Sequence, residues 1–143
     1  MHIAGACHCG ALRFSLDWPE GELAVPARAC GCTFCFKHGA TWTAHPDASL
    51  VVQINDPALV ERYRFGTETA DFHVCLGCGV PVVATSRIDD HEYAVVNINT
   101  FDGVDMTRVD RSDADFEGES FADRLARRRS TAIADVRFVV LPA

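Results

Sequence analysis

The chain has 143 residues, 48% of them hydrophobic, with seven cysteines and a formal net charge of −7. This length predicts a single domain over residues 1–143, large enough to bury a core without cross-links. The acidic balance disfavours a nucleic-acid-binding face, which would need clustered basic side chains.

The N-terminal segment has neither the charged nor the apolar region of a signal peptide, and no apolar run reaches the ~18 residues of a membrane span. We therefore expect a cytoplasmic protein without membrane or nucleic-acid partners. Because seven is an odd number, the cysteines cannot all form disulfides within one chain. In a reducing compartment, clustered cysteines more often bind metals or act in catalysis.

Short segments of alternating hydrophobicity dominate the chain. In residues 11–16, the side chains of Leu12, Phe14 and Leu16 fall on one face of an extended strand. Seven further segments, rich in β-branched and aromatic residues, are predicted strands: Ala40–His45, Leu50–Ile54, Tyr63–Phe65, Ala70–Val74, Val80–Thr85, Tyr93–Ile98 and Val136–Leu141. These eight segments predict a mainly β fold.

One helix is predicted, over Phe121–Arg129 near the C-terminus. Ser120 can cap its start, with Asp123 three residues later, and the arginine run 127–129 suits its C-terminal end. The preceding segment 110–119 carries five acidic residues and is expected to be a solvated loop. The arginine run could mark a phosphate site, but the favoured interpretation is a helix end that faces water or the acidic segment.

All seven cysteines fall in three clusters whose thiols lie two or three residues apart. The clusters are Cys7-His8-Cys9, Cys30-Gly31-Cys32-Thr33-Phe34-Cys35 and Cys75-Leu76-Gly77-Cys78. At this spacing one turn of backbone offers two ligands to a metal. Glycines are expected to supply the positive φ angles and close backbone approach of such turns, at positions Gly10, Gly31, Gly77 and Gly79. The clusters predict bound metal, with zinc as the favoured ion.

The number of ligands divides the clusters into two zinc sites per chain. A closed structural zinc takes four ligands, and the outer clusters supply four thiolates, from Cys7, Cys9, Cys75 and Cys78. The remaining triplet, Cys30, Cys32 and Cys35, leaves a fourth position open, as in catalytic zinc sites.

Other interpretations of the cysteines stay open. His38, three residues after Cys35, could close a second structural zinc site. Thiolates alone could hold an iron–sulfur cluster, and a metal-free triplet could carry out redox chemistry. His8 and His73 lie within or beside the outer clusters and are expected outside the ligand set.

The motifs also carry a family resemblance. CxCGAxxF at residues 7–14, CxCxxC followed by HGA at 30–40, and CxxCG at 75–79 resemble the glutathione-dependent formaldehyde-activating family. Residues 93–100 and 116–118 resemble its second half, so the likeness spans nearly the whole chain. The resemblance implies the Mss4-like zinc-binding β fold, here with one C-terminal helix. It also implies structural zinc on Cys7, Cys9, Cys75 and Cys78 and catalytic zinc on Cys30, Cys32 and Cys35.

A zinc ion with three thiolates carries net negative charge and is a weak Lewis acid, so hydrolysis suits it poorly. Binding and deprotonating an incoming thiol suits it better. Together with the resemblance, this predicts a carbon–sulfur lyase-type enzyme, similar to an S-(hydroxymethyl)glutathione synthase. It would join glutathione, the expected co-substrate, or a similar thiol to formaldehyde or another small aldehyde as a hemithioacetal. The alternative is a non-catalytic zinc-binding interaction module of the same fold.

Four residues near the triplet are candidates for supporting roles. Lys37, the single lysine of the chain, could offset the thiolate charge or bind a glutathione carboxylate, or it could be an ordinary exposed lysine. His38 is the candidate proton carrier. Phe36 and Trp42 are candidate walls of the ligand cavity, although aromatic residues on strands also suit a core.

Overall fold

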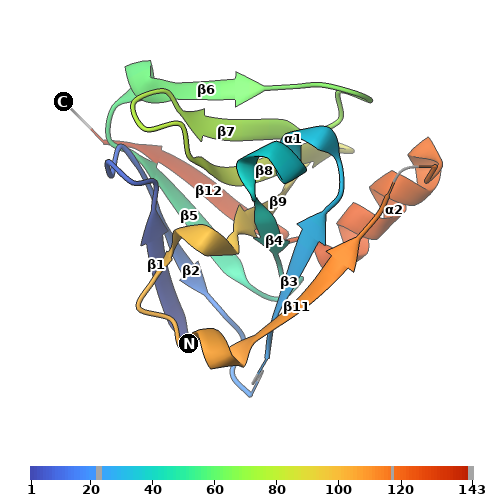
Figure 1. The fold of residues 1–143 in the computed structure, drawn as a ribbon, viewed down its shortest axis with the longest axis horizontal. Coiled ribbons are helices and arrows are strands. Elements are labelled where there is room, and N and C mark those ends of the chain that lie inside the picture. Colours follow the sequence, from blue (N-terminus) through green and yellow to red (C-terminus); the bar gives the residue numbers. More distant parts are fainter. Residues whose placement is uncertain (22–23, 117, 142–143) are drawn as a thin grey trace.

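The computed structural model describes residues 1–21, 24–116 and 118–141, which form two β-sheets and one main helix (Figure 1). The strands of the described residues are β1 (His2–Ala6), β2 (Leu12–Asp17), β3 (Val25–Cys30), β4 (Thr41–Thr43), β5 (Ser49–Ile54), β6 (Val60–Tyr63), β7 (Asp71–Cys75), β8 (Pro81–Ile88), β9 (His91–Asn97), β10 (Phe101–Asp102), β11 (Val109–Ala114) and β12 (Asp135–Val140). The α-helices are the short α1 (Thr33–His38) and the longer α2 (Phe121–Thr131), and 3-10 turns occur at η1 (Pro57–Leu59), η2 (Ile98–Thr100) and η3 (Met106–Arg108). The predicted mainly β fold with one C-terminal helix is confirmed. None of the helices in these residues is long and apolar enough to cross a membrane.

The strands are arranged in two sheets, here called sheet A and sheet B. Sheet A has five strands in the order β10-β1-β2-β5-β12, and sheet B has seven in the order β11-β3-β4-β9-β8-β7-β6. Neighbouring strands are antiparallel, except that β12 runs parallel to β5 and β11 runs parallel to β3. Through these two parallel pairs, the C-terminal part of the chain joins both sheets: β11, before α2 in the sequence, joins sheet B, and β12, after α2, joins sheet A.

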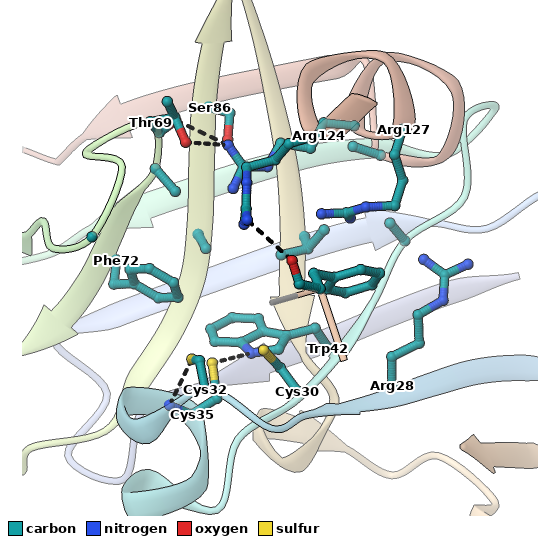
Figure 2. Close-up of a pocket in the computed structure, with 18 of the residues that line it drawn as sticks. Arg28, Cys30, Cys32, Cys35, Trp42, Thr69, Phe72, Ser86, Arg124 and Arg127 are labelled. Carbon is teal, nitrogen blue, oxygen red and sulfur yellow. Dashed lines mark hydrogen bonds between the residues drawn. The ribbon is translucent and has the colours of Figure 1, made fainter. Parts of the chain in front are cut away.

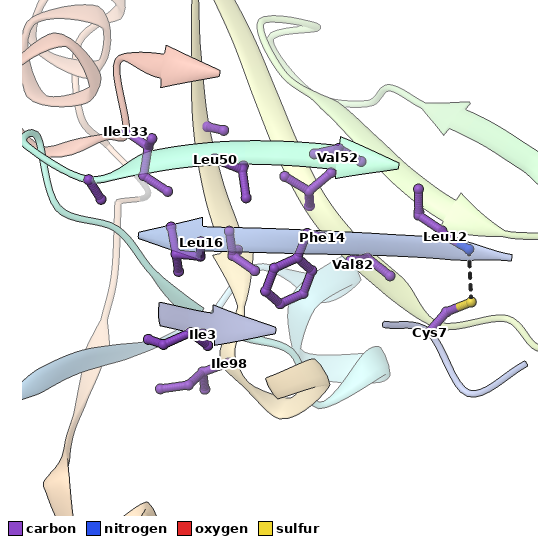
Figure 3. Packing of buried hydrophobic residues seen from close by; sticks show 14 of the residues in the cluster. Ile3, Cys7, Leu12, Phe14, Leu16, Leu50, Val52, Val82, Ile98 and Ile133 are labelled. Atoms are coloured by element: carbon purple, nitrogen blue, oxygen red, sulfur yellow. Dashed lines mark hydrogen bonds between the residues drawn. The ribbon is translucent and has the colours of Figure 1, made fainter. Parts of the chain in front are cut away.

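The main core lies between the two sheets (Figure 3). Strand β2 alternates as predicted, with Leu12, Phe14 and Leu16 buried toward this core. Side chains of the second sheet and of η2 meet them, including Val82 and Ile98. Each large apolar side chain buried here contributes about 1.5–3 kcal/mol relative to exposure.

Sheet B is covered on both faces, and its second face becomes the base of the candidate site. In the β8–β9 pair, Val83 lies opposite Val96, and both belong to the main core. The next pair, Ala84 opposite Val95, points to the other side of the sheet, because successive strand residues alternate. A second, smaller cluster packs there around Trp42.

Each of the eight predicted strands has a counterpart, with shifted ends. The largest shift is at Tyr63–Phe65, where the strand instead covers Val60–Tyr63. Four strands were not predicted, β1, β3, β10 and β11, and β11 overturns the prediction of a solvated acidic loop. Residues 109–114 pair in parallel with β3 at the edge of the sheet, where backbone hydrogen bonds hold the chain while the acidic side chains stay exposed. Glu117 lies outside the described residues.

The predicted helix is confirmed and ends two residues later than expected, at Thr131. The Ser120 side chain caps it, as predicted, by accepting a hydrogen bond from the backbone N–H of Asp123 at 3.1 Å. The short helix α1 was not predicted. It begins after Cys32, whose sulfur accepts a hydrogen bond from the Cys35 backbone N–H, and it ends at Gly39, which has a φ of 64°.

Gly5 in β1 provides a test of the packing between neighbouring strands. A Cβ at this position would collide with the Phe14 ring and with the backbone oxygen of Thr100. We expect Gly5→Ala to lower the free energy of unfolding by about 2 kcal/mol or more, measured by urea denaturation. Gly31→Ala is the control, because its nearest new neighbour would lie 3.7 Å away. Equal stability of the two variants would contradict this packing.

Candidate functional site

The outer cysteine clusters meet at one place in the fold. The sulfur atoms of Cys7, Cys9, Cys75 and Cys78 all lie within 4.8 Å of one another. The Cys9 sulfur is 3.8 Å from that of Cys7 and 3.5 Å from that of Cys75. Four thiolates bound tetrahedrally at the usual Zn–S length of about 2.3 Å would lie about 3.8 Å apart. The four thiols therefore fit a structural zinc ion in both donor type and spacing.

Two turns position this cluster, one after β1 and one after β7. In the first, Gly10 adopts a φ of 83° and its N–H donates to the Cys7 carbonyl. In the second, Gly79 has a φ of 81° and its N–H donates to the Cys75 carbonyl at 2.7 Å. Gly77 serves a different purpose, because a Cβ there would lie 3.5 Å from the Cys9 sulfur. The expected positive φ angles are thus found at Gly10 and Gly79, but not at Gly31 or Gly77.

The two thiols of the second turn differ in pKa. Burial raises the pKa of the Cys75 thiol to about 12. Burial also acts to raise the pKa of Cys78, but hydrogen bonds from the backbone N–H groups of Cys9 and Val80 lower it to about 6. A cation bound to all four sulfurs would compensate the charge of the buried thiolates, which is the ordinary role of the ion in a structural site.

The triplet forms a second group, separate from the first. The sulfur atoms of Cys30, Cys32 and Cys35 lie within 4.8 Å of one another, and no histidine belongs to this group in the described part of the chain. Cys30 ends β3, Cys32 caps α1, and the buried Cys35 accepts a hydrogen bond from the indole N–H of Trp42 at 3.3 Å. The set offers three sulfur ligands to a single ion.

Hydrogen bonding concentrates negative charge on one member of the triplet. The Cys35 thiol hydrogen-bonds to Cys30 and lowers the pKa of Cys30 to about 5, and the charge of Arg127 acts in the same direction. The same contact raises the pKa of Cys35 above its usual range. The triplet is therefore anionic near neutral pH and attracts a cation.

The triplet opens onto a cavity of about 470 Å³ (Figure 2). Its base is the outer face of sheet B, because the registers of β3, β4, β8 and β9 bring Trp42, Ala84 and Val95 to that side. Besides Trp42 in the base, the aromatic side chains of its lining are Phe65, Phe72, Tyr93 and Phe116. The volume is within the range of small-molecule sites, about 300–1,000 Å³.

Trp42 lines this cavity, whereas three other candidate residues do not. Phe36, Lys37 and His38 are exposed on α1, and Phe36 retains 79% of its accessible surface. Cys32 and Cys35 are three residues apart, so both side chains lie on the side of α1 that faces the cavity. The residues that follow Cys35 lie on the other sides of the helix, which face solvent. The His38 ring instead lies 4.5 Å from that of Phe34. The structure does not bring these three side chains to the cavity.

The remaining histidines near the clusters also lie outside the ligand groups. His8 is exposed in the turn between Cys7 and Cys9. His73 is buried against Phe138, with ring centroids 5.1 Å apart, and its Nε2 is 2.8 Å from the Thr85 hydroxyl. Burial lowers the pKa of His73 to about 4, so its ring is neutral.

Sequence reasoning missed the arginines of the cavity. Arg124, Arg127 and Arg128 of α2 and Arg28 of β3 line it. The expectation that the arginine run faces water or the acidic segment is therefore wrong for Arg128, which donates to the Thr69 hydroxyl, and holds for the exposed Arg129. The predicted contact with the acidic segment is present, since Arg127 donates to both carboxylate oxygens of Glu119. Arg124, Arg127 and Arg128 are three and four residues apart, a spacing that places them on one face of a helix. This spacing was the signal in the sequence that could have revealed the arginine group.

Two comparisons relate the chain to known proteins. Residues 2–117 match the family model for the glutathione-dependent formaldehyde-activating enzyme. The crystal structure of a Rhodobacter sphaeroides protein, a structural genomics target, is similar, with 28% sequence identity and a TM-score of 0.53. That match covers 76% of this chain and 99% of the other. All seven cysteines lie within the family match, whereas α2 begins beyond it, at Phe121.

Proposed function

The chain belongs to the glutathione-dependent formaldehyde-activating enzyme family, and we propose that it joins a thiol to a small aldehyde. Glutathione or a close analogue is the proposed thiol, and formaldehyde is the first candidate aldehyde. The sulfur forms a new bond to the carbonyl carbon, the carbonyl π electrons move to oxygen, and the thiol proton is delivered to that oxygen. The product is a hemithioacetal, so the activity is that of a carbon–sulfur lyase running in the direction of synthesis. Residues 1–143 would act as one zinc-binding catalytic domain.

The observation that carries this proposal is a set of three sulfur ligands opening onto a cavity of small-molecule size. We assign a structural zinc to Cys7, Cys9, Cys75 and Cys78, and a second zinc to the triplet Cys30, Cys32 and Cys35. When bound there, the second ion would supply the positive charge that lowers the pKa of an incoming thiol. Three protein ligands leave that position free for the substrate.

The protein's own side chains would prepare the site in two ways. The Trp42 N–H donates to the Cys35 sulfur and so fixes its orientation and moderates its charge. The aromatic side chains of the lining would hold a thiol and an aldehyde close together, so that the two gain effective concentration. Neither role needs Lys37 or His38, which lie outside the cavity lining.

The direct test is acceleration of hemithioacetal exchange. Glutathione and formaldehyde also form the adduct without a catalyst, and exchange NMR measures the rate at equilibrium. We expect the zinc-loaded protein to raise this rate in proportion to its concentration. A protein with both sites filled that gives no acceleration would contradict the proposal and favour a non-catalytic zinc module.

The Trp42 contact gives a prediction of its own. We expect Trp42→Phe to weaken metal binding at the triplet by about tenfold, because the hydrogen bond to the Cys35 sulfur is lost. Competition with a chromogenic chelator measures this affinity. Trp18→Phe is the matched control, since Trp18 is also buried but its indole N–H has no hydrogen-bond partner among the described residues. Equal affinities in the two variants would show that the contact does not support the metal.

A further inference from the structure

The cavity has a positively charged wall opposite its sulfur atoms. Figure 2 shows Arg124 and Arg127 on the far side of Trp42 from the triplet, with Arg28 beside them. Together with Arg128, these residues bring four guanidinium groups to the lining. Arg28 comes from the part of the chain that matches the family, but the other three arginines come from α2, beyond residue 117. The wall is therefore largely a feature of this chain's own C-terminal helix.

The helix that carries the wall is held firmly on sheet B. Arg128 donates to the Thr69 hydroxyl at 2.7 Å, and the residue two positions after the helix, Ile133, exchanges backbone hydrogen bonds with Ala94 of β9 at 2.9 Å. The guanidinium of Arg127 also lies 3.6 Å over the Phe116 ring. Arg127 and Arg128 are thus fixed in position rather than free in solvent.

The carboxylates nearby do not balance these charges. Glu119 accepts both hydrogen bonds of Arg127, at 3.0 and 3.2 Å, and its Oε1 is 3.9 Å from the Nε of Arg124. The Arg124 Nε is buried and has no hydrogen-bond partner among the described residues. Asp115 is the acidic side chain among the described lining residues. Within the described ranges, four cations therefore face two carboxylates.

The crowding of the cations is also visible at Arg128. Burial lowers its pKa to about 10, and the positive charges of Arg127 and Arg124 act in the same direction. An anion entering the cavity would relieve this repulsion and could form charge-assisted, paired hydrogen bonds with a guanidinium.

We propose that this wall binds a carboxylate of the substrate, so that the protein selects thiols that carry a carboxylate at a distance from the sulfur. The inference rests on the proposed function, because it takes the triplet as the place where the sulfur binds. Such a ligand spans the cavity, with its sulfur at the cysteines, its middle against Trp42 and Phe116, and its carboxylate at the arginines. Glutathione has this form, whereas a small neutral thiol cannot reach the wall.

Binding of S-methylglutathione tests the wall without the reaction, because its methylated sulfur has no proton to lose. In calorimetry with the zinc-loaded full chain, we expect its diethyl ester, which lacks both carboxylates, to bind at least about tenfold more weakly. Arg124→Gln and Arg28→Gln should each weaken binding of the acid by about five- to tenfold and leave binding of the ester unchanged. Two variants on separate elements guard against a single folding defect.

Arg129→Gln is the matched control, because Arg129 follows Arg128 in the same helix but is exposed and lies 4.0 Å from Asp89. It should bind S-methylglutathione as the natural chain does. Equal binding of acid and ester, or an effect of Arg124→Gln and Arg28→Gln on zinc affinity alone, would overturn the inference. Inorganic phosphate that binds as tightly as the acid would also overturn it, in favour of a phosphate site.

The hemithioacetal exchange rate separates the two proposals. If the protein binds the acid more tightly than the ester but accelerates no exchange, the carboxylate-binding wall is supported and the proposed reaction is contradicted. If the protein accelerates exchange equally with glutathione and with its diethyl ester, the reaction is supported and the carboxylate-binding wall is contradicted.

Discussion

Replacement of Cys75 with serine is expected to remove one metal ion and to destabilise the whole fold. Cys75 ends β7, is fully buried, and lies 3.5 Å from the sulfur of Cys9, which follows β1 in the other sheet. A structural zinc site of this kind contributes on the order of 10 kcal/mol, comparable to the whole stability of a domain. We expect the free energy of unfolding to fall by at least about 4 kcal/mol, measured by thermal and urea denaturation.

His8→Ala is the matched control for Cys75→Ser. His8 lies between two of the cysteines but is exposed and outside the metal-binding group. Its replacement should leave both metal content and stability unchanged. If Cys75→Ser retained full metal content and melted with the natural chain, the structural zinc site would be refuted.

Replacement of Cys32 with serine is expected to have the opposite profile, with lost activity and a retained fold. Removal of one of three ligands should empty the second metal position and lower the exchange rate at least about 100-fold, since even changes outside the ligand set of a metal cost 10- to 100-fold. The Cys32 sulfur also caps α1 by accepting from the Cys35 N–H at 3.4 Å. Serine is a favoured cap residue, so the helix start should survive the substitution.

Metal content, exchange rate and melting temperature, measured together, check this second prediction. The expected result is one zinc ion in place of two, with a melting temperature close to that of the natural chain. A Cys32→Ser variant with full activity would contradict a role for the triplet in the reaction. A variant as unstable as Cys75→Ser would show that the triplet holds the fold together instead.

The cysteine grouping was predictable because it depends on counts and spacing. Four ligands make a closed metal site, and three leave one position open. The tight turns at Gly10 and Gly79 were predictable because each glycine lies in a short loop between two strands. The strand pattern was equally accessible wherever one face is buried, as at Leu12, Phe14 and Leu16.

The missed strands and site residues depend on contacts between distant parts of the chain. Strand β11 is mostly polar and forms because it pairs with β3, about eighty positions earlier in the sequence. The arginines of α2 reach the cavity because Thr69 and Ala94 hold the helix against the sheet. Local sequence carries no record of such packing. Lys37 and His38 neighbour the triplet in sequence but lie outside the cavity for a local reason, because α1 turns them toward solvent.

Cadmium-113 NMR of the metal-substituted protein tests the central claim, that one set of four thiolates is closed and one set of three is open to a thiol. Cadmium takes the same sulfur ligands, and its chemical shift reports how many sulfurs surround it. We expect two signals per chain, of which one stays fixed and the other moves on addition of glutathione as a fourth sulfur binds. A single signal, or two signals that glutathione leaves unchanged, would contradict the claim.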